Sequence, residues 1–177
     1  MTYKMCKNKV ISLFMALVCG ILTCTNLQAA EGNYKVKAVF LFKFFKYISW
    51  PDGAGMEKTI CVYGQNPFGK SLDYIIKNKL SSAEYKVNYI DDVAEVKGCR
   101  LLFIGKSQDK VATVLAAIKQ EEGILSVSDI NGFARKGGGI EFVDHPNKIG
   151  LLLNVSAFTH AGLNASSKLM KIVKTVQ

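Results

Sequence analysis

The chain has 177 residues, of which 49% are hydrophobic and 21% charged, and its formal net charge is +9. This composition excludes a disordered or fibrous chain, and the length fits one globular domain with a single core. The lysines are scattered among apolar residues, which favours a solvated surface over a nucleic-acid-binding patch. A weak bias toward anionic lipid headgroups or an acidic partner stays open.

The first 29 residues have the features of a secretory signal peptide. Three lysines within residues 4–9 precede an apolar run over residues 10–22, and residues 27–29 form a suitable cleavage site. We expect cleavage after Ala29 and a periplasmic domain over residues 30–177. An uncleaved membrane anchor is the alternative, but the apolar run is shorter than the roughly 20 residues that a spanning helix needs. Cleavage removes three of the 23 basic side chains and none of the 14 acidic ones, which leaves a net charge of +6.

An apolar and aromatic run over residues 34–50 predicts a mostly buried helix that Pro51 ends. Apolar side chains at helical spacing give the expected core stripe, which consists of Val36, Phe40, Phe44 and Tyr47. Three more aromatic side chains fall outside that stripe: Phe42, Phe45 and Trp50. They would form either a dimer or partner face or a further part of the core, and core packing is the favoured use.

From residue 59 onward, short β-rich runs alternate with helical ones. Strands are expected at 59–63, 85–90, 100–104 and 124–128, helices at 69–79 and 108–122, and a short helical or irregular piece at 91–96. Strands and helices that take turns in this way predict βαβ units and a parallel sheet.

Two further strands, at 140–143 and 149–153, are joined by a short turn, so they should pair as an antiparallel hairpin. A helical region from Ser156 onward, broken near Gly162 and Asn164, is expected to pack back over the sheet. The predicted fold class is therefore α/β: a single domain with a mostly parallel sheet, helices on both faces and an antiparallel hairpin at one edge.

Residues 64–71, GQNPFGKS, match the phosphate-binding loop G-x-x-x-x-G-K-[ST] and lie between a predicted strand and a predicted helix. That loop works by aiming successive backbone N–H groups at phosphates, and Pro67 removes one of these donors. The neighbouring strand also ends without the aspartate that would hold Mg²⁺. We interpret the segment as a strand-to-helix turn with Phe68 in the core, and we expect no nucleotide hydrolysis.

The remaining polar residues lack the spacing of a catalytic or metal site. His145 and His160 each stand without the carboxylate or cysteine neighbours that a zinc site or a nucleophilic triad requires. Ser126, Ser128 and Asp129 could be drawn as a nucleophile with helpers, but an aspartate after a strand more often bonds backbone N–H groups in a turn. We therefore predict no enzyme activity, no metal and no cofactor.

Two cysteines, Cys61 and Cys99, remain after the signal peptide is removed. In an oxidising compartment an even count favours pairing. Cys61 lies in the first predicted strand of the sheet and Cys99 just before the third, and these strands are neighbours in a common doubly wound order. We predict a disulfide that contributes about 4 kcal/mol on the chain-entropy model. Two buried thiols are the alternative.

Four separated motifs resemble the YfiR/HmsC-type periplasmic proteins. The longest is the pattern SVSD-x-x-GFA-x-x-GG-x-I-x-F, present here at residues 126–142. KAVFLFKFFKYISWP at 37–51 is similar to the amino-terminal helix of that family, and AGLNASSKLMKIV at 161–173 to its closing helix. CVYGQNPFG at 61–69 is the fourth matching segment.

The resemblance implies a periplasmic inhibitor that docks on the periplasmic domain of an inner-membrane diguanylate cyclase and represses it, which lowers cyclic di-GMP and biofilm formation. An outer-membrane lipoprotein of YfiB type is the implied partner that draws the inhibitor away. A homodimer stays open. The alternative is a periplasmic small-ligand-binding module of doubly wound type, with its ligand at the carboxyl ends of the strands.

A partner surface is expected around the last predicted strand of the hairpin. Residues 151–153 are all leucine, so this expected edge strand is apolar on both faces, whereas an exposed strand normally alternates apolar and polar side chains. The predicted partner-binding residues are Leu151, Leu153, Val155, Phe158 and Leu163. Coverage of this apolar face by the final helices is the alternative.

Overall fold

The computed structural model describes residues 24–51, 57–79, 84–106, 110–119 and 121–177. The chain divides into two units, residues 1–33 and 34–177, and the α/β fold belongs to the second. The expected signal peptide lies mostly outside the described residues, so cleavage after Ala29 stays a prediction. In the part of the chain that is described, no helix is long and apolar enough to cross a bilayer.

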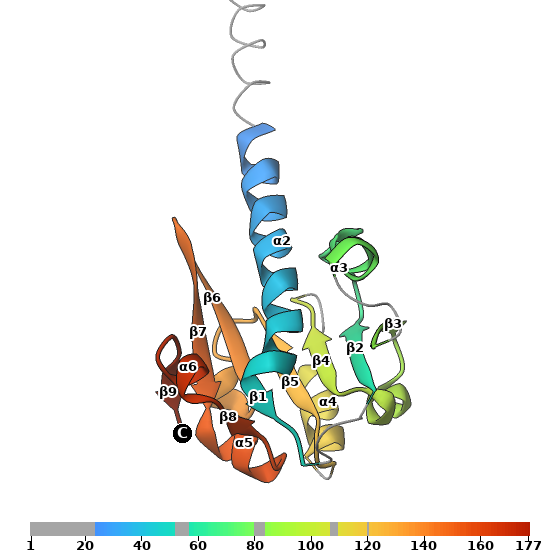
Figure 1. The fold of residues 1–177 in the computed structure, drawn as a ribbon, viewed down its shortest axis with the longest axis vertical. Helices are drawn as coiled ribbons and strands as arrows, with labels where there is room; N and C mark the ends of the chain where they lie inside the picture. Colours follow the sequence, from blue (N-terminus) through green and yellow to red (C-terminus); the bar gives the residue numbers. More distant parts are fainter. Residues whose placement is uncertain (1–23, 52–56, 80–83, 107–109, 120) are drawn as a thin grey trace, which may run out of the picture. The chain divides into compact units, whose positions relative to one another are not determined.

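A seven-stranded sheet in the order β3-β2-β4-β5-β6-β7-β9 forms the centre of the second unit (Figure 1). Its strands are Lys58–Tyr63 (β2), Tyr85–Ile90 (β3), Leu101–Ile104 (β4), Leu125–Ser128 (β5), Ile140–His145 (β6), Lys148–Asn154 (β7) and Lys174–Val176 (β9). Neighbouring strands from β3 to β6 are parallel, β7 is antiparallel to β6, and β9 is parallel to β7. The α/β class with a mostly parallel sheet is therefore confirmed.

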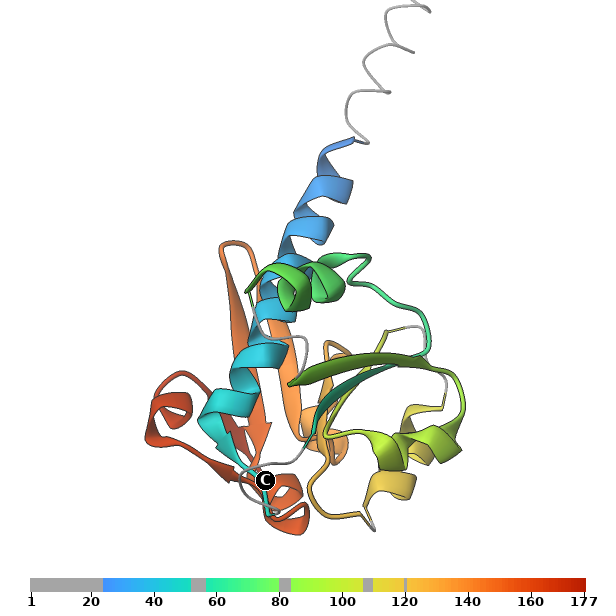
Figure 2. The ribbon, with the colours of Figure 1, turned by 45° about the vertical axis from the view of Figure 1, so that its right-hand side comes forward.

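Helical elements cover both faces of the sheet (Figure 2). The elements that precede β6 are the helices α2 (Cys24–Tyr47), α3 (Ser71–Lys79) and α4 (Val111–Ile118), and the 3₁₀ turns η1 (Val93–Gly98) and η2 (Ala134–Lys136). α2 and α3 pack on one face, and α4 and η1 on the other. Side chains of β2 alternate between the two cores, since Ile60 and Val62 join the first and Cys61 and Tyr63 the second. Burial on both faces explains why β4 is apolar throughout and β2 is apolar from Ile60 onward.

The core side of α2 differs from the predicted stripe. Phe44 is buried, but Val36 is 47% exposed, and Phe40 and Tyr47 are only half-buried. The side chains of α2 that face the core on this side are instead Lys37, Ala38, Leu41 and Phe44. The difference arises because a lysine, Lys37, occupies the buried side, and a pattern that sorts residues into apolar and polar assigns it to the surface.

The three aromatic residues outside the predicted stripe belong to the core. Phe42 and Trp50 are buried, and the half-buried Phe45 stacks on Trp50 with ring centroids 5.0 Å apart. Tyr85 meets the ring edges of both Phe42 and Phe45. Core packing, the favoured use, is the one that the structure shows.

The chain after β7 is less helical than predicted. It forms α5 (Val155–His160), β8 (Asn164–Ala165), α6 (Ser167–Met170) and β9. The two helices are separated around Gly162, as expected, but the segment that resembles a closing helix is mostly turns and short strands. β8 pairs with β1 (Ile48–Ser49) in a small antiparallel sheet.

The strand β7 is not the edge strand that was predicted. It lies between β6 and β9, with Leu153 opposite Ile140 on one side and Thr175 on the other. Its outer backbone edge is paired because the chain turns back after α6 and adds β9 outside it, and its buried leucines, Leu151 and Leu153, pack in the core cluster that contains α2. The hairpin therefore lies next to the edge of the sheet, and β9 forms that edge.

Candidate functional site

The motif at residues 126–142 connects β5 to β6, and its hydroxyl groups bind neighbouring backbone. The Ser126 hydroxyl accepts the N–H of Gly139 (2.9 Å). The Ser128 hydroxyl donates to the Ile104 carbonyl on β4 (2.7 Å) and accepts a backbone N–H from the following turn. Both serines hold the loop in place, which is a structural use and not that of an activated nucleophile.

The buried carboxylate of Glu141 holds the middle of the same loop. It accepts the N–H groups of Gly132 (3.0 Å) and Ala134 (3.1 Å). The Asn154 amide donates to the Ala134 carbonyl (2.6 Å), and its oxygen accepts the N–H of Ala157 in the first turn of α5. One polar network thus fixes the motif loop and the start of α5 relative to each other.

A buried ion-pair cluster lies where α2 meets β5 and β6. The Lys37 ammonium is 2.8 Å from Asp129 Oδ2 and 2.9 Å from Asp144 Oδ2. The Tyr34 hydroxyl donates to the same oxygen of Asp129 (2.7 Å). Lys106 is farther away, at 3.5 and 3.8 Å from the two carboxylates, and its side chain is 54% exposed.

The cluster is electrically balanced, because two lysines face two carboxylates. Burial and the Asp129 carboxylate raise the pKa of Tyr34, so its hydroxyl stays protonated and can donate. The prediction that Asp129 bonds backbone N–H groups in a turn is wrong, because Oδ2 of Asp129 contacts the side chains of Tyr34, Lys37 and Lys106 instead. The cluster therefore ties α2 to the sheet, and its balanced charge offers little to a charged ligand.

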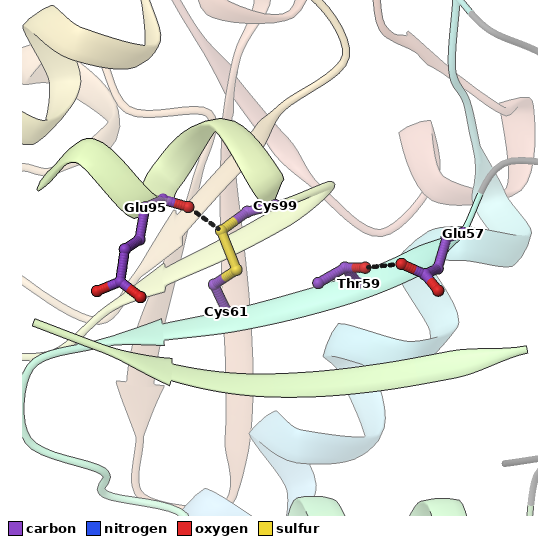
Figure 3. Close-up of a disulfide and its surroundings, with 5 residues drawn as sticks. All are labelled: Glu57, Thr59, Cys61, Glu95 and Cys99. Carbon is purple, nitrogen blue, oxygen red and sulfur yellow. Dashed lines mark hydrogen bonds between the residues drawn. A yellow bond between two sulfur atoms is a disulfide. The ribbon is translucent and has the colours of Figure 1, made fainter. Parts of the chain in front are cut away.

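The predicted disulfide is present between Cys61 on β2 and Cys99 just before β4 (Figure 3). The two Cα atoms are 5.7 Å apart, and both side chains are buried. β2 and β4 are neighbours in the sheet, as the doubly wound order requires. The bridge spans 38 positions of the sequence and links β2 to the end of η1.

Residues 64–71 form the strand-to-helix turn that was predicted. The Asn66 side-chain oxygen accepts the N–H of Phe68 (2.9 Å), and its Nδ2 donates to the Gly69 carbonyl (3.0 Å). Phe68 is buried, and its ring centroid lies 4.7 Å from that of Phe103. The turn thus uses a backbone N–H that a bound phosphate would need.

The usual ligand position of a doubly wound fold is the point where strand order reverses, here between β2 and β4. The loops that follow these two strands are in contact, since a Cβ added to Gly105 would lie 3.1 Å from the Gln65 carbonyl oxygen. His145 and His160 are exposed at the ends of β6 and α5. Among the described residues, no three His, Cys, Asp or Glu side chains form a group that could hold a metal ion.

An open groove of about 400 Å³ lies between α4 and α5. Apolar side chains from both helices line it, together with backbone of the motif loop. The principal apolar residues are Leu115, Ile118, Ala157, Phe158 and Leu163, and the basic ones are Lys119, Lys136 and His160. The groove is a surface that an apolar segment of a protein partner could occupy.

The five predicted partner-binding residues divide between two places. Phe158 and Leu163 line the groove, although each is only 4% exposed, and Val155 is 41% exposed beside it on α5. Leu151 and Leu153 lie in the core beneath α2. The α4 wall of the groove was missed, because the sequence carries no signal that α4 and α5 are neighbours.

The strand order and the groove define a class, a single-domain doubly wound α/β protein with an open surface groove. A family model described as YfiR/HmsC-like matches residues 34–174, and the chain belongs to that family. A solved structure of a conserved domain protein from Vibrio cholerae O1 biovar El Tor is similar, with a TM-score of 0.50 and 9% identity, over 81% of this chain and 60% of that one. At this identity the likeness shows the fold alone. No curated protein matches the sequence.

Proposed function

We propose that this protein is a periplasmic regulatory binding protein that represses an inner-membrane diguanylate cyclase by docking on its periplasmic domain. Membership of the YfiR/HmsC-like family suggests a periplasmic regulator of cyclic di-GMP signalling, and this is the observation that carries the proposal. An outer-membrane lipoprotein of YfiB type would relieve the repression by binding the inhibitor. The hydroxyls of Ser126 and Ser128 and the carboxylate of Asp129 bond to other parts of the fold, which supports binding over catalysis.

The docking surface that we assign is the groove between α4 and α5. It is open and largely apolar, and its α5 wall is held by the Asn154 cap and the Glu141 network, so it is preorganised. Phe158 and Leu163 form buried parts of its wall and cannot be changed without disturbing the core. Exposed Ala112 and Ala116 on α4 are the residues through which the surface can be tested.

The test compares two variants on the same helix. Ala116→Glu places a longer, charged side chain in the groove, and we expect binding to the cyclase periplasmic domain to weaken about tenfold or more, because it fills space that an apolar segment of the partner would occupy and its carboxylate loses hydration there. Thr113→Glu adds the same charge at an exposed position of α4 that does not line the groove, and it should bind as the wild type does. Calorimetry with the purified domain measures both.

In cells, the same variants are expressed in a deletion host and cyclic di-GMP is measured. We expect the wild type and Thr113→Glu to repress and Ala116→Glu to fail. If Ala116→Glu is folded, exported and still represses, the groove is the wrong surface. If deletion of the gene leaves both cyclic di-GMP and biofilm unchanged, the proposed function itself is wrong.

A further inference from the structure

Two segments distant in sequence, the second half of α2 and the chain from α6 to β9, form one continuous face. The Ser166 N–H donates to the Tyr47 carbonyl (2.8 Å). β1, which directly follows α2 in the chain, pairs with β8. A hollow of about 310 Å³ lies between α2 and the α6 segment. Figures 1 and 2 both show α6 beside the last turns of α2. We call this surface, formed by residues 34–50 and 161–177, the α2/α6 face.

The α2/α6 face carries the net positive charge of the domain. Its two segments contain seven lysines and no aspartate or glutamate. The rest of residues 30–177 holds 13 basic and 14 acidic side chains, so the excess of +6 comes entirely from this face. Only one of the seven, Lys37, is buried. The domain is therefore strongly polarised, although its lysines look scattered along the sequence.

Most of the exposed lysines of this face keep their charge free for a ligand. Among the described residues, five of them form no ion pair: Lys43, Lys46, Lys168, Lys171 and Lys174. Lys43 and Lys168 line the hollow itself. Their flexible side chains and compact charges suit contacts with many phosphate groups more than recognition of one carboxylate, for which arginine is the better residue.

Exposed aliphatic side chains lie among these lysines. Val36 (47% exposed) and Val39 (41%) share a side of α2 with Lys43 and Lys46, because positions 36, 39, 43 and 46 are three or four residues apart. Met170 (42%) and Ile172 (58%) are exposed on the carboxy-terminal segment. Exposed aliphatic groups ringed by lysines are typical of surfaces that lie in the headgroup layer of a bilayer.

We propose that the α2/α6 face docks the domain on an anionic lipid bilayer. The aliphatic side chains enter the headgroup boundary while the lysines meet lipid phosphates, each contributing on the order of 1 kcal/mol. The α4 wall of the groove lies on the opposite face of the sheet from α2, so this wall stays accessible to a protein partner, and the groove meets the α2/α6 face at Ala161 and Leu163. This inference is independent of the proposed function, and it would confine the protein to the surface where a membrane-bound partner is found.

The test is cosedimentation of the mature chain with vesicles of phosphatidylglycerol and phosphatidylcholine in equal parts, with phosphatidylcholine vesicles as the reference. We expect binding to the anionic vesicles only, falling steeply with salt. Lys168→Glu/Lys171→Glu should weaken it at least about tenfold, since two attractions become repulsions. The control Lys110→Glu/Lys119→Glu makes the same charge change at exposed positions near the two ends of α4 and should change binding less than about twofold.

A second variant tests the aliphatic part. Val39→Ser/Ile172→Ser keeps every charge, and it should also weaken binding by about tenfold, because apolar area no longer enters the bilayer. Circular dichroism checks that each variant is folded. Absence of binding to anionic vesicles, or equal losses in the face variant and the control variant, would overturn the proposal. The proposal would also be wrong if the face served a protein contact instead. In that case Val39→Ser/Ile172→Ser would abolish a stable dimer or a complex with an acidic protein, and vesicle binding would persist.

Discussion

Lys37 affects both the side of α2 that faces the sheet and the charge balance of the interior. Its side chain is 1% exposed and lies within 3 Å of carboxylate oxygens of Asp129 and Asp144. A buried lysine is tolerated only where its charge is compensated, and here the compensation comes from strands β5 and β6. The contact therefore sets which side of α2 faces the sheet.

We expect Lys37→Met to lower the free energy of unfolding by about 3–5 kcal/mol, because it leaves the buried Asp129 carboxylate without its closest cation. Lys106→Met removes a lysine near the same two carboxylates, but that side chain is 54% exposed and 3.5 Å or more away. Its cost should stay below about 1 kcal/mol. Urea unfolding measures both. Equal losses in the two variants would mean that burial of Lys37 has no special role.

Tyr34 predicts a pH dependence of stability at the alkaline end. Burial, followed by the hydrogen bond to Asp129, raises the pKa of Tyr34, so the folded chain keeps a proton that the unfolded chain releases above about pH 10. The stabilisation is fully present below that pH and is lost as the pH rises. Tyr34→Phe should show a shallower fall in unfolding midpoint between about pH 8 and pH 11. An identical fall in both proteins would contradict this assignment.

At the scale of elements, the loop between β5 and β6 is specified by glycines as much as by polar side chains. A Cβ on Gly138 would collide with the ring of Phe133, which is fully buried in the second core. Gly137, its neighbour, has a φ of 100°, in the left-handed region that favours glycine. The double glycine of the motif therefore has two different causes, close packing and backbone conformation.

Gly138→Ala should therefore destabilise the domain by about 1–3 kcal/mol through overpacking. Gly98→Ala, at a site where an added Cβ meets nothing within 4 Å, is the matched control and should change stability by less than about 1 kcal/mol. Thermal unfolding followed by circular dichroism compares them. A Gly138→Ala protein as stable as the Gly98→Ala protein would show that Phe133 moves aside freely.

At the scale of the whole molecule, the disulfide and the positively charged face lie on opposite sides of the sheet, each with a different core. The disulfide lies in the core covered by α4 and η1, whereas the lysine-rich face is built on α2, over the other core. The half of the sheet from β5 to β9 has no cysteine. It is held by packing and by the Glu141 and Asn154 network.

Loss of the disulfide should lower the free energy of unfolding by about 4 kcal/mol, the value expected for a loop of this length. The double variant Cys61→Ala/Cys99→Ala provides this measurement in guanidinium without reductant. Intact mass of the wild type, alkylated with and without reduction, shows whether the bond is present. Two alkylated thiols in air-oxidised wild type would contradict the disulfide.

Most of the sheet could be predicted because each of its longer strands has a recognisable pattern in its own residues. The predicted strand at 85–90 has the same bounds as β3, and those at 59–63 and 124–128 differ from β2 and β5 by one residue. The run at 59–63 is apolar on both faces and most of the run at 85–90 alternates apolar and polar residues, so both are recognisable as strands without knowledge of their register or orientation. By contrast, β9 has only three residues and its strand conformation depends on pairing with β7, so no local pattern could reveal it.

By itself, the sequence determined the α/β class, the disulfide partners and the turn at residues 64–71, because each follows from local pattern or residue count. Only the tertiary structure decided that Lys37 is buried, that Phe158 faces α4, and that lysines from both ends of the domain share one face. Those three features depend on pairs of residues more than 90 positions apart or on elements that touch only after folding. Proximity of that kind is created by packing, and no spacing along the chain encodes it in readable form.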